Sequence, residues 1–238
     1  MMLEHFKGDE VFVKKILDYQ FQALHHQRMV LTPFYNPHEQ EIVRSVIGKE
    51  LKVLSYGGFT NAENQRMIIC PDFYEIEKSD FEIQLVEVIY RQQFGRIQHK
   101  DILGALMNLG IKRECVGDIF DGERCFFACT KQTYPYIIQT LKQIKKSKIK
   151  LQECHEDIEI IHDYTSRSFI LSSMRLDKVV STMFKVPRAL ASEAIRNGHV
   201  KVNYKIVEEV SYLCRVKIVE ENKQTRQGNY VVSGYFYK

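Results

Sequence analysis

The spacing of apolar residues divides the first third of the chain into helices and strands. Apolar side chains recur at helical intervals in residues 9–29, and residues 51–71 hold two strand-like runs around a Gly-Gly turn. Two prolines lie between these segments, and the second, Pro37, suits the first turn of another helix. The pattern predicts an N-terminal α/β module over residues 1–75.

Strand-like and helix-like patterns then alternate in the order βαββαβ. The first helix, HKDILGALMNLG, has Asp101 as its expected N-cap and Gly110 as its expected C-terminal stop. The two strands that follow are joined by Asp121-Gly122, which is a strong hairpin signal. This order predicts a ferredoxin-like domain over residues 76–163, with four antiparallel strands and two helices on one face.

The same fold is used by RRM-type RNA binders, which stack bases on exposed aromatic residues of the sheet, and by many proteins that bind no RNA. Phe126 and Phe127 lie in the corresponding region. Because adjacent residues of a strand face opposite sides of the sheet, at least one of them should be part of the core. The sequence contains no Gly-aromatic RRM signature, and base stacking stays open beside a purely structural role.

A change in composition marks the last domain. The chain is acidic after Cys154 and then rich in serine, so we expect a linker over residues 164–172 and a C-terminal domain over residues 173–238. The fold class that these elements predict is α+β, with three small domains.

Two short amphipathic helices and a strand should open this C-terminal domain. The first helix is expected to have Ser173 as its N-cap and to end at Phe184, and Pro187 fits the first turn of the second helix. In the strand that follows, apolar and polar residues alternate, so Val200 and Val202 should point toward the core.

Charge is distributed unevenly along the chain. Residues from 166 to the end include 13 basic and 6 acidic side chains, a net charge of +7, whereas residues 1–165 include 21 and 24, a net charge of −3. A basic region in a globular protein indicates a polyanionic partner, most often nucleic acid.

Guanidinium groups suit phosphates because their planar fork donates two parallel hydrogen bonds. The candidate RNA contacts are the polar residues outside the apolar stripes, namely Arg175, Lys178, Arg188, Ser192, Arg196, His199, Lys201, Asn203 and Lys205. A merely solvated charged face is the alternative interpretation.

The segment MRLDKVVSTMFKVPRALASEAIRNGHVKVN resembles the ribosomal protein S-four-type RNA-binding domain, also called the alpha-L motif. The matching residues are Arg175, Leu176, Asp177, Lys178, Arg188, Ala191, Ile195, Gly198, Val200, Val202 and Asn203. In that family the helix pair and the loop after it hold structured RNA, so the resemblance implies phosphate contacts by Arg188, Arg196 and Lys201. Two features depart from the family pattern: Pro187 replaces a serine, and residues 216–225 resemble an insertion before the last strand.

The segments GGFTNAENQR and QHKDILGALMNLGIKRECVGDI resemble, in order and spacing, motifs of the bacterial YlmH family. Together with the C-terminal domain, this resemblance covers essentially the whole chain. It implies a cytoplasmic, monomeric, non-catalytic RNA-binding protein that needs no cofactor. The implied partners are rRNA, tRNA and the large ribosomal subunit, with a role in translation or in the rescue of stalled subunits that carry peptidyl-tRNA.

Two other functions stay open. An RNA-modifying enzyme would use residues 1–165 as its catalytic part. Arg175, Leu176 and Asp177 resemble the R-L-D of pseudouridine synthases, whose aspartate is the nucleophile, but no such catalytic domain follows them. We therefore expect Asp177 to be a carboxylate at a helix start, favoured by the helix dipole. A role in cell division rests on the gene neighbourhood of the family.

The remaining polar residues predict neither catalysis nor metal binding. Lys112 and Arg113 are secondary candidates for RNA or ribosome contact, with solvation at a strand end as the alternative. The six cysteines form no C-x-x-C pair, which favours free thiols in a reducing compartment. No apolar run approaches the roughly 20 residues of a transmembrane helix, and the first residues lack the apolar region of a secretory signal.

Overall fold

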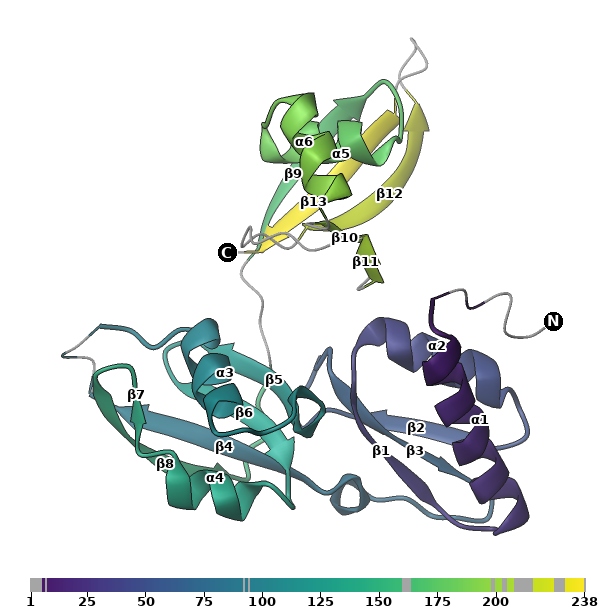
Figure 1. Cartoon of the computed structure of the whole chain (residues 1–238), viewed down its shortest axis with the longest axis vertical. Coiled ribbons are helices and arrows are strands. Elements are labelled where there is room, and N and C mark those ends of the chain that lie inside the picture. The colour runs from purple at the N-terminus through teal and green to yellow at the C-terminus, as the bar shows by residue number, and fades with distance from the viewer. Residues whose placement is uncertain are drawn as a thin grey trace. The chain divides into compact units, whose positions relative to one another are not determined.

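The computed structural model describes residues 6, 8–91, 93, 95–159, 164–197, 200–202, 205–207, 216–224 and 230–237, with side chains only up to residue 159 and for residues 168–197 and 200. The chain forms two compact units, residues 1–160 and 161–238 (Figure 1). None of the helices in the described ranges has the length and apolar character needed to cross a membrane.

The N-terminal module is a three-stranded antiparallel sheet with two helices on one face. Its elements are α1 (Glu10–His25), β1 (Val30–Tyr35), α2 (Pro37–Ile47), β2 (Lys52–Tyr56) and β3 (Gln65–Cys70), and the strand order is β1-β3-β2. Apolar residues of both helices, such as Ile16 and Val43, share one core with Met67 of the sheet. Pro37 lies in the first turn of α2 as predicted, and Asn36 and Glu39 form a reciprocal capping box in front of it.

The sequence pattern did not predict strand β1, because this strand contains Pro33. Proline donates no hydrogen bond to a ladder, so it is confined to edge strands and bulges. Strand β1 is an edge strand, and its pairing with β3 is irregular between Leu31 and Phe34. The hydroxyl of Thr32 accepts a hydrogen bond from the Met67 N–H at 2.8 Å, which replaces a backbone acceptor at this bulge.

The middle of the chain has the predicted ferredoxin-like order, with one short extra strand. Its elements are β4 (Ile83–Tyr90), α3 (His99–Asn108), β5 (Val116–Asp121), β6 (Cys125–Thr130), α4 (Tyr134–Thr140), β7 (Gln143–Ile144) and β8 (Ser147–Cys154), with the strand order β5-β6-β4-β8-β7. The N-cap of α3 is Gln98 and not Asp101. Asp101 is the third helical residue and accepts a hydrogen bond from the Gln98 N–H at 2.9 Å, as in a capping box.

Both faces of this sheet are packed. Phe127 lies among the residues that α3 and α4 cover, whereas Phe126 lies on the opposite face against Phe34 and Phe59 of the N-terminal module. Their exposed fractions are 0% and 2%, so both phenylalanines belong to cores. The sheet face on which an RRM would stack bases is therefore closed at Phe126.

The two family-like motifs of residues 1–160 meet at this packed face. A Cβ atom on Gly117 would lie 2.6 Å from the Phe34 ring, so only glycine permits this approach. The carboxylate of the next residue, Asp118, accepts hydrogen bonds from the backbone N–H of Glu63 at 2.5 Å and of Asn64 at 3.2 Å. The motifs thus stabilise the contact between the two halves of this unit.

Buried hydrogen bonds from Arg66 join strand β1 to the segment that precedes β4. Its side chain is buried and donates hydrogen bonds to the carbonyl groups of Thr32 (2.8 Å), Phe81 (2.8 Å) and Glu82 (3.1 Å). Burial lowers the pKa of this guanidinium from its ordinary value. The hydrogen bonds to these three carbonyl groups stabilise the positive charge of Arg66, whose burial would otherwise be unfavourable.

The C-terminal unit combines a helix pair with a three-stranded sheet and a short hairpin. Its elements are β9 (Tyr164–Leu171), α5 (Leu176–Phe184), α6 (Arg188–Arg196), β10 (Val200–Val202), β11 (Lys205–Val207), β12 (Val216–Gln224) and β13 (Tyr230–Tyr237). The sheet order is β12-β13-β9, and β10 pairs with β11. Leu171, Val179 and Met183 form a small core, and Ala191 of α6 is fully buried.

Three expectations for this unit are wrong. Residues 164–172 are not a linker, because β9 pairs with β13 along its whole length. The apparent insertion at 216–225 is mostly strand β12, which pairs with the other side of β13. Helix α5 starts at Leu176 with Arg175 at its N-cap position, so Ser173 is no cap. A polar edge strand and a linker have similar compositions, which explains the first error.

Candidate nucleic-acid interface

A short, fixed turn joins the two helices that carry the candidate arginines. Lys185 ends α5 in the left-handed conformation, with φ of 53°. The Ser181 hydroxyl donates a hydrogen bond to the Val186 carbonyl at 2.8 Å, and the Val186 N–H donates one to the Ser181 carbonyl at 3.1 Å. These bonds fix the path from α5 into α6, which begins immediately after Pro187.

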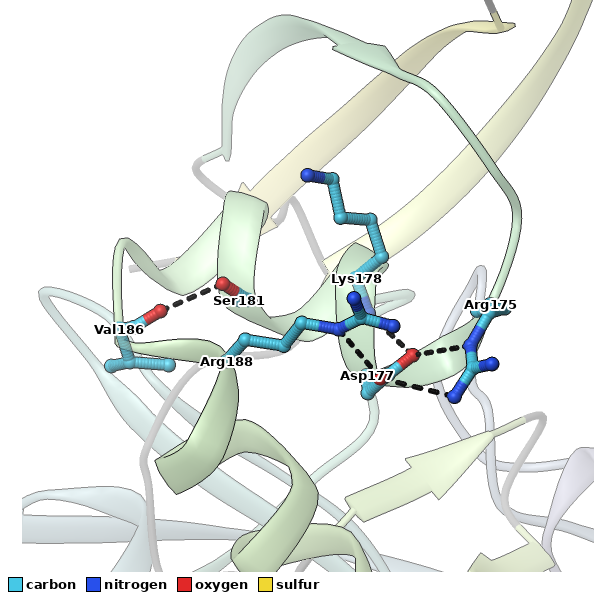
Figure 2. A network of polar contacts seen from close by, with 6 residues as sticks. All are labelled: Arg175, Asp177, Lys178, Ser181, Val186 and Arg188. Carbon is cyan, nitrogen blue, oxygen red and sulfur yellow. Dashed lines mark hydrogen bonds and ion pairs between the residues drawn. The ribbon is translucent and has the colours of Figure 1, made fainter.

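This turn brings Arg175 and Arg188 to the same carboxylate, that of Asp177 (Figure 2). Arg188 Nε lies 2.8 Å from Asp177 Oδ2, and Arg175 Nε lies 3.2 Å from Asp177 Oδ1. The Lys178 N–H also donates to Oδ1 at 3.0 Å. The sequence predicted both arginines as RNA contacts but gave no indication that one aspartate would link them.

The aspartate is covered while the arginines face solvent. The exposed fraction of the Asp177 side chain is 13%, compared with 71% for Arg175 and 54% for Arg188. Hydrogen bonds from Arg188 and then from Arg175 lower the pKa of Asp177 to about 2. The carboxylate is therefore ionised at neutral pH and holds the two guanidinium groups near each other.

This arrangement leaves hydrogen-bond donors for a phosphate. Arg188 donates its Nε–H to Asp177, and among the described residues its two terminal amino groups remain available as donors. The group of three side chains keeps a net charge of +1. Asp177 is also a poor candidate for a nucleophile, because both of its oxygens already accept hydrogen bonds. Its geometry suits the positioning of arginines.

The other candidates in the described part of this unit lie on the same two helices. Arg196 is exposed, and its Nε lies 3.4 Å from the Ser192 carbonyl one turn earlier. Arg188 and Arg196 are eight residues apart on one helix face, which corresponds to about 12 Å along the axis. In Figure 2 the Lys178 ammonium group points away from Asp177. These positions add spaced positive charges beside the arginine pair.

The structure does not describe the side chains of four candidate residues. His199 and Asn203 lie outside the described residues. Lys201 and Lys205 belong to strands β10 and β11, whose backbones are described but whose side chains are not. Their contacts with RNA stay predictions from the sequence.

The secondary candidates in the first unit have different surroundings. Arg113 donates hydrogen bonds to the carbonyl groups of Val116 and Gly117 at the start of β5. The side chain of Lys112 is 80% exposed and lies 4.0 Å from Glu114. Lys112 is thus open to a partner, whereas Arg113 is engaged in the fold.

In the described ranges, no three His, Cys, Asp or Glu side chains gather as metal ligands would. The five cysteines with described positions are free, and four of them are buried: Cys70, Cys125, Cys129 and Cys154. Burial raises the pKa of Cys129 to about 12, which makes its thiol unreactive.

Comparison with known proteins gives a match for each part of the chain. Residues 8–74 match the family model "YlmH, N-terminal", residues 77–157 match "Putative RNA-binding domain in YlmH", and residues 174–217 match "S4 domain". A Bacillus subtilis (strain 168) protein is 35% identical over 215 residues, which are 88% of this chain and 84% of the relative. The chain belongs to the YlmH family.

One curated relative and one solved structure show what this YlmH-family chain is similar to. The Bacillus subtilis relative is called "Ribosome-associated protein quality control protein P2". A solved structure called "Cell division protein ylmH from Streptococcus pneumoniae" is 33% identical, with a TM-score of 0.54, and the match covers 61% of this chain and 90% of that one. The mixed α/β fold and the C-terminal S4 domain of the YlmH family are thus both present in this chain.

Proposed function

We propose that this protein is a non-enzymatic RNA-binding factor that binds structured rRNA or tRNA on the large ribosomal subunit. It would act in translation or in the rescue of stalled subunits that carry peptidyl-tRNA. The observation that carries the proposal is the pair of exposed arginines, Arg175 and Arg188, held by Asp177 on the helix pair of an S4 domain. The name of the Bacillus subtilis relative supports a ribosomal partner.

The arrangement favours recognition through phosphates and shape. Arginines at fixed positions on two helices match the phosphates of a folded RNA and carry no base information by themselves. A factor of this kind needs no catalytic group.

Sedimentation with separated ribosomal subunits at low and physiological salt tests the proposal. We expect the wild-type protein to migrate with the large subunit and the double variant Arg188→Glu/Arg196→Glu to remain unbound. Lys14→Glu/Lys49→Glu is the matched control, because both lysines are exposed in the other unit and the charge change is the same. If charge reversal impairs folding, Arg188→Gln/Arg196→Gln replaces it. Equal binding by the folded arginine variant, or no wild-type binding to either subunit, would contradict the proposal.

An RNA-modifying enzyme is distinguished by its product. Mass analysis of rRNA and tRNA nucleosides from a deletion strain should show no lost modification. A modification that disappears on deletion and returns with the gene would overturn the non-enzymatic assignment.

The name of the Streptococcus pneumoniae protein is the one observation that favours a role in cell division. Such a role predicts localisation at the septum that persists in the Arg188→Glu/Arg196→Glu variant. Septal localisation that is lost with RNA binding would instead place division downstream of the ribosomal role.

A further inference from the structure

The middle domain cannot present its sheet aromatics to RNA bases in the manner of an RRM. Phe126 is buried against the N-terminal module, and the Arg124 guanidinium covers its ring at 4.8 Å. Arg124 is itself held by Glu87 at 2.8 Å and Glu156 at 3.0 Å. Any RNA that this domain binds must therefore contact it away from Phe126.

A long stretch of this domain contains no acidic residue. Between Glu123 and Glu153 the chain has no Asp or Glu but seven basic residues, which are Arg124, Lys131, Lys142, Lys145, Lys146, Lys148 and Lys150. The mildly acidic net charge of residues 1–165 conceals this local excess. Five of the seven lie within nine consecutive positions.

These five lysines gather on one hairpin. They span the connection from α4 to β7, the tip of the β7–β8 hairpin and the first half of β8, and all five are exposed. Gln143 pairs with Lys148 and Ile144 with Ser147, so Lys145 and Lys146 form a two-residue tip. Below, "lysine surface" denotes Lys142, Lys145, Lys146, Lys148 and Lys150.

Strand geometry aligns two of the lysines. Lys148 and Lys150 are two positions apart and lie on one face of β8, about 7 Å from each other. Ile149 and Leu151, which alternate with them, face the core under the helices. Lys150 lies opposite Ile89 of β4, which is 40% exposed, so this end of the sheet face is open.

One lysine anchors the tip and leaves the others available. Lys145 Nζ lies 2.6 Å from Asp101 Oδ2 of α3. Burial alone would raise the pKa of Asp101, but the hydrogen bonds from Lys145 and from the Gln98 N–H together lower it. In the portion of the chain that the structure describes, no carboxylate lies within ion-pair distance of Lys146, Lys148 or Lys150.

A groove of about 620 Å³ adjoins the lysine surface, between α3 and the turn from α4 to β7. Lys100, Lys142 and Lys145 line it together with Gly104. A Cβ atom on Gly104 would meet nothing within 4 Å, so packing does not require a glycine inside this helix. The missing side chain leaves the helix backbone open to close approach by a ligand.

We propose that the lysine surface is a second RNA-binding surface, which holds backbone phosphates of structured RNA around the β7–β8 hairpin. Lys142 and Lys145 lie on the groove side of this hairpin, and Lys148 and Lys150 lie on the open sheet face. The inference rests on the proposed function, because it assumes that the protein binds RNA through its S4 domain. Lysines act as flexible point charges that fit phosphates without reading bases. Protection of the β8 edge from strand pairing would account for Lys148 and Lys150, but it does not account for Lys142, Lys145 and Lys146, which lie beyond that edge.

The test uses the full chain with Lys146→Glu/Lys148→Glu/Lys150→Glu. Its matched control is Lys14→Glu/Lys49→Glu/Lys131→Glu, whose three lysines are exposed, with Lys131 at the opposite end of the same sheet. The probes are purified large ribosomal subunits and a stem-loop RNA, each titrated over a series of KCl concentrations. We expect affinity to fall at least tenfold at physiological salt in the lysine-surface variant, and the salt slope to fall by roughly two to three units. The control should bind within about twofold of wild type.

Charge reversal preserves edge protection, since acidic residues also prevent strand pairing, so solubility and melting temperature should stay unchanged. The triple Lys→Gln variant serves if reversal prevents folding. Lysine-surface and control variants that bind RNA equally well, while Arg188→Glu/Arg196→Glu weakens binding, would overturn the inference and leave the proposed function standing. A wild-type protein that binds neither probe would overturn both. Lost binding to phosphatidylglycerol vesicles with unchanged RNA binding would assign the surface to membranes and overturn the inference.

Discussion

The two compact units use the residues of their recognisable motifs in opposite ways. In residues 1–160, Arg66 is buried and Asp118 is hydrogen-bonded to a neighbouring turn, so both stabilise the fold. In residues 161–238, Arg175 and Arg188 belong to an equally recognisable motif but face solvent, linked by Asp177. The difference shows that a motif match identifies a family, whereas burial and hydrogen-bond partners distinguish stabilising residues from binding residues.

Replacing Arg66 should break the first half of this comparison most strongly. Arg66→Met leaves three buried carbonyl groups without their donor, and we expect the free energy of unfolding to fall by about 3 kcal/mol or more. Urea unfolding of residues 1–160 within the full chain provides the measurement. Arg44→Met is the control, because Arg44 is exposed and its loss should change stability by less than about 0.5 kcal/mol. A variant as stable as the control would show that Arg66 is no structural residue.

Removing the Asp177 charge tests the second half of this comparison, which concerns the exposed arginines of the C-terminal unit. In Asp177→Asn the two guanidinium groups lose their common anchor while the local positive charge rises. We expect binding to unstructured RNA, such as poly(U), to strengthen and the preference for large subunits over poly(U) to decline severalfold. Competition binding at fixed salt measures the ratio. An unchanged ratio would mean that Asp177 does not position the arginines for RNA.

The pH dependence of the ion pairs gives the smallest expected effect. The folded-state pKa of Asp177, about 2, lies below its ordinary value of 3.8. The ion pairs therefore contribute stability that is fully present above about pH 4 and is lost as the pH falls to 2. Amide hydrogen exchange in α5 and α6 should distinguish wild type from Asp177→Asn at pH 6 but not at pH 2. A difference that grows with acidity would contradict this assignment.

The sequence predicted the parts of the fold that depend on local periodicity. The βαββαβ order, the hairpin at Asp121-Gly122 and the two S4 helices follow from spacing and turn residues within short windows. Strand β1 was missed because Pro33 conceals a strand that tolerates proline only at its bulge. Strand β9 was missed because pairing with β13, about 65 residues later in the chain, has no local signal.

The candidate site was predictable in its charges but not in its contacts. The helical pattern placed Arg188 and Arg196 outside the core, and both are exposed. The link from Arg188 to Asp177 depends on the turn at Lys185, whose left-handed conformation is unusual for a lysine and is not indicated by its sequence. The closed sheet face at Phe126 likewise depends on packing between modules, which periodicity does not report.

The most direct test of the account is the salt dependence of binding to the large ribosomal subunit. Binding of wild type and of the Arg188→Glu/Arg196→Glu variant to large subunits would be measured at KCl concentrations from about 50 to about 300 mM. Phosphate contacts change the affinity strongly over this range. If both arginines contact phosphates, the slope of log Kobs against log salt should become shallower by roughly two units. An unchanged slope in a folded variant would show that the arginine face of the S4 domain does not hold the RNA.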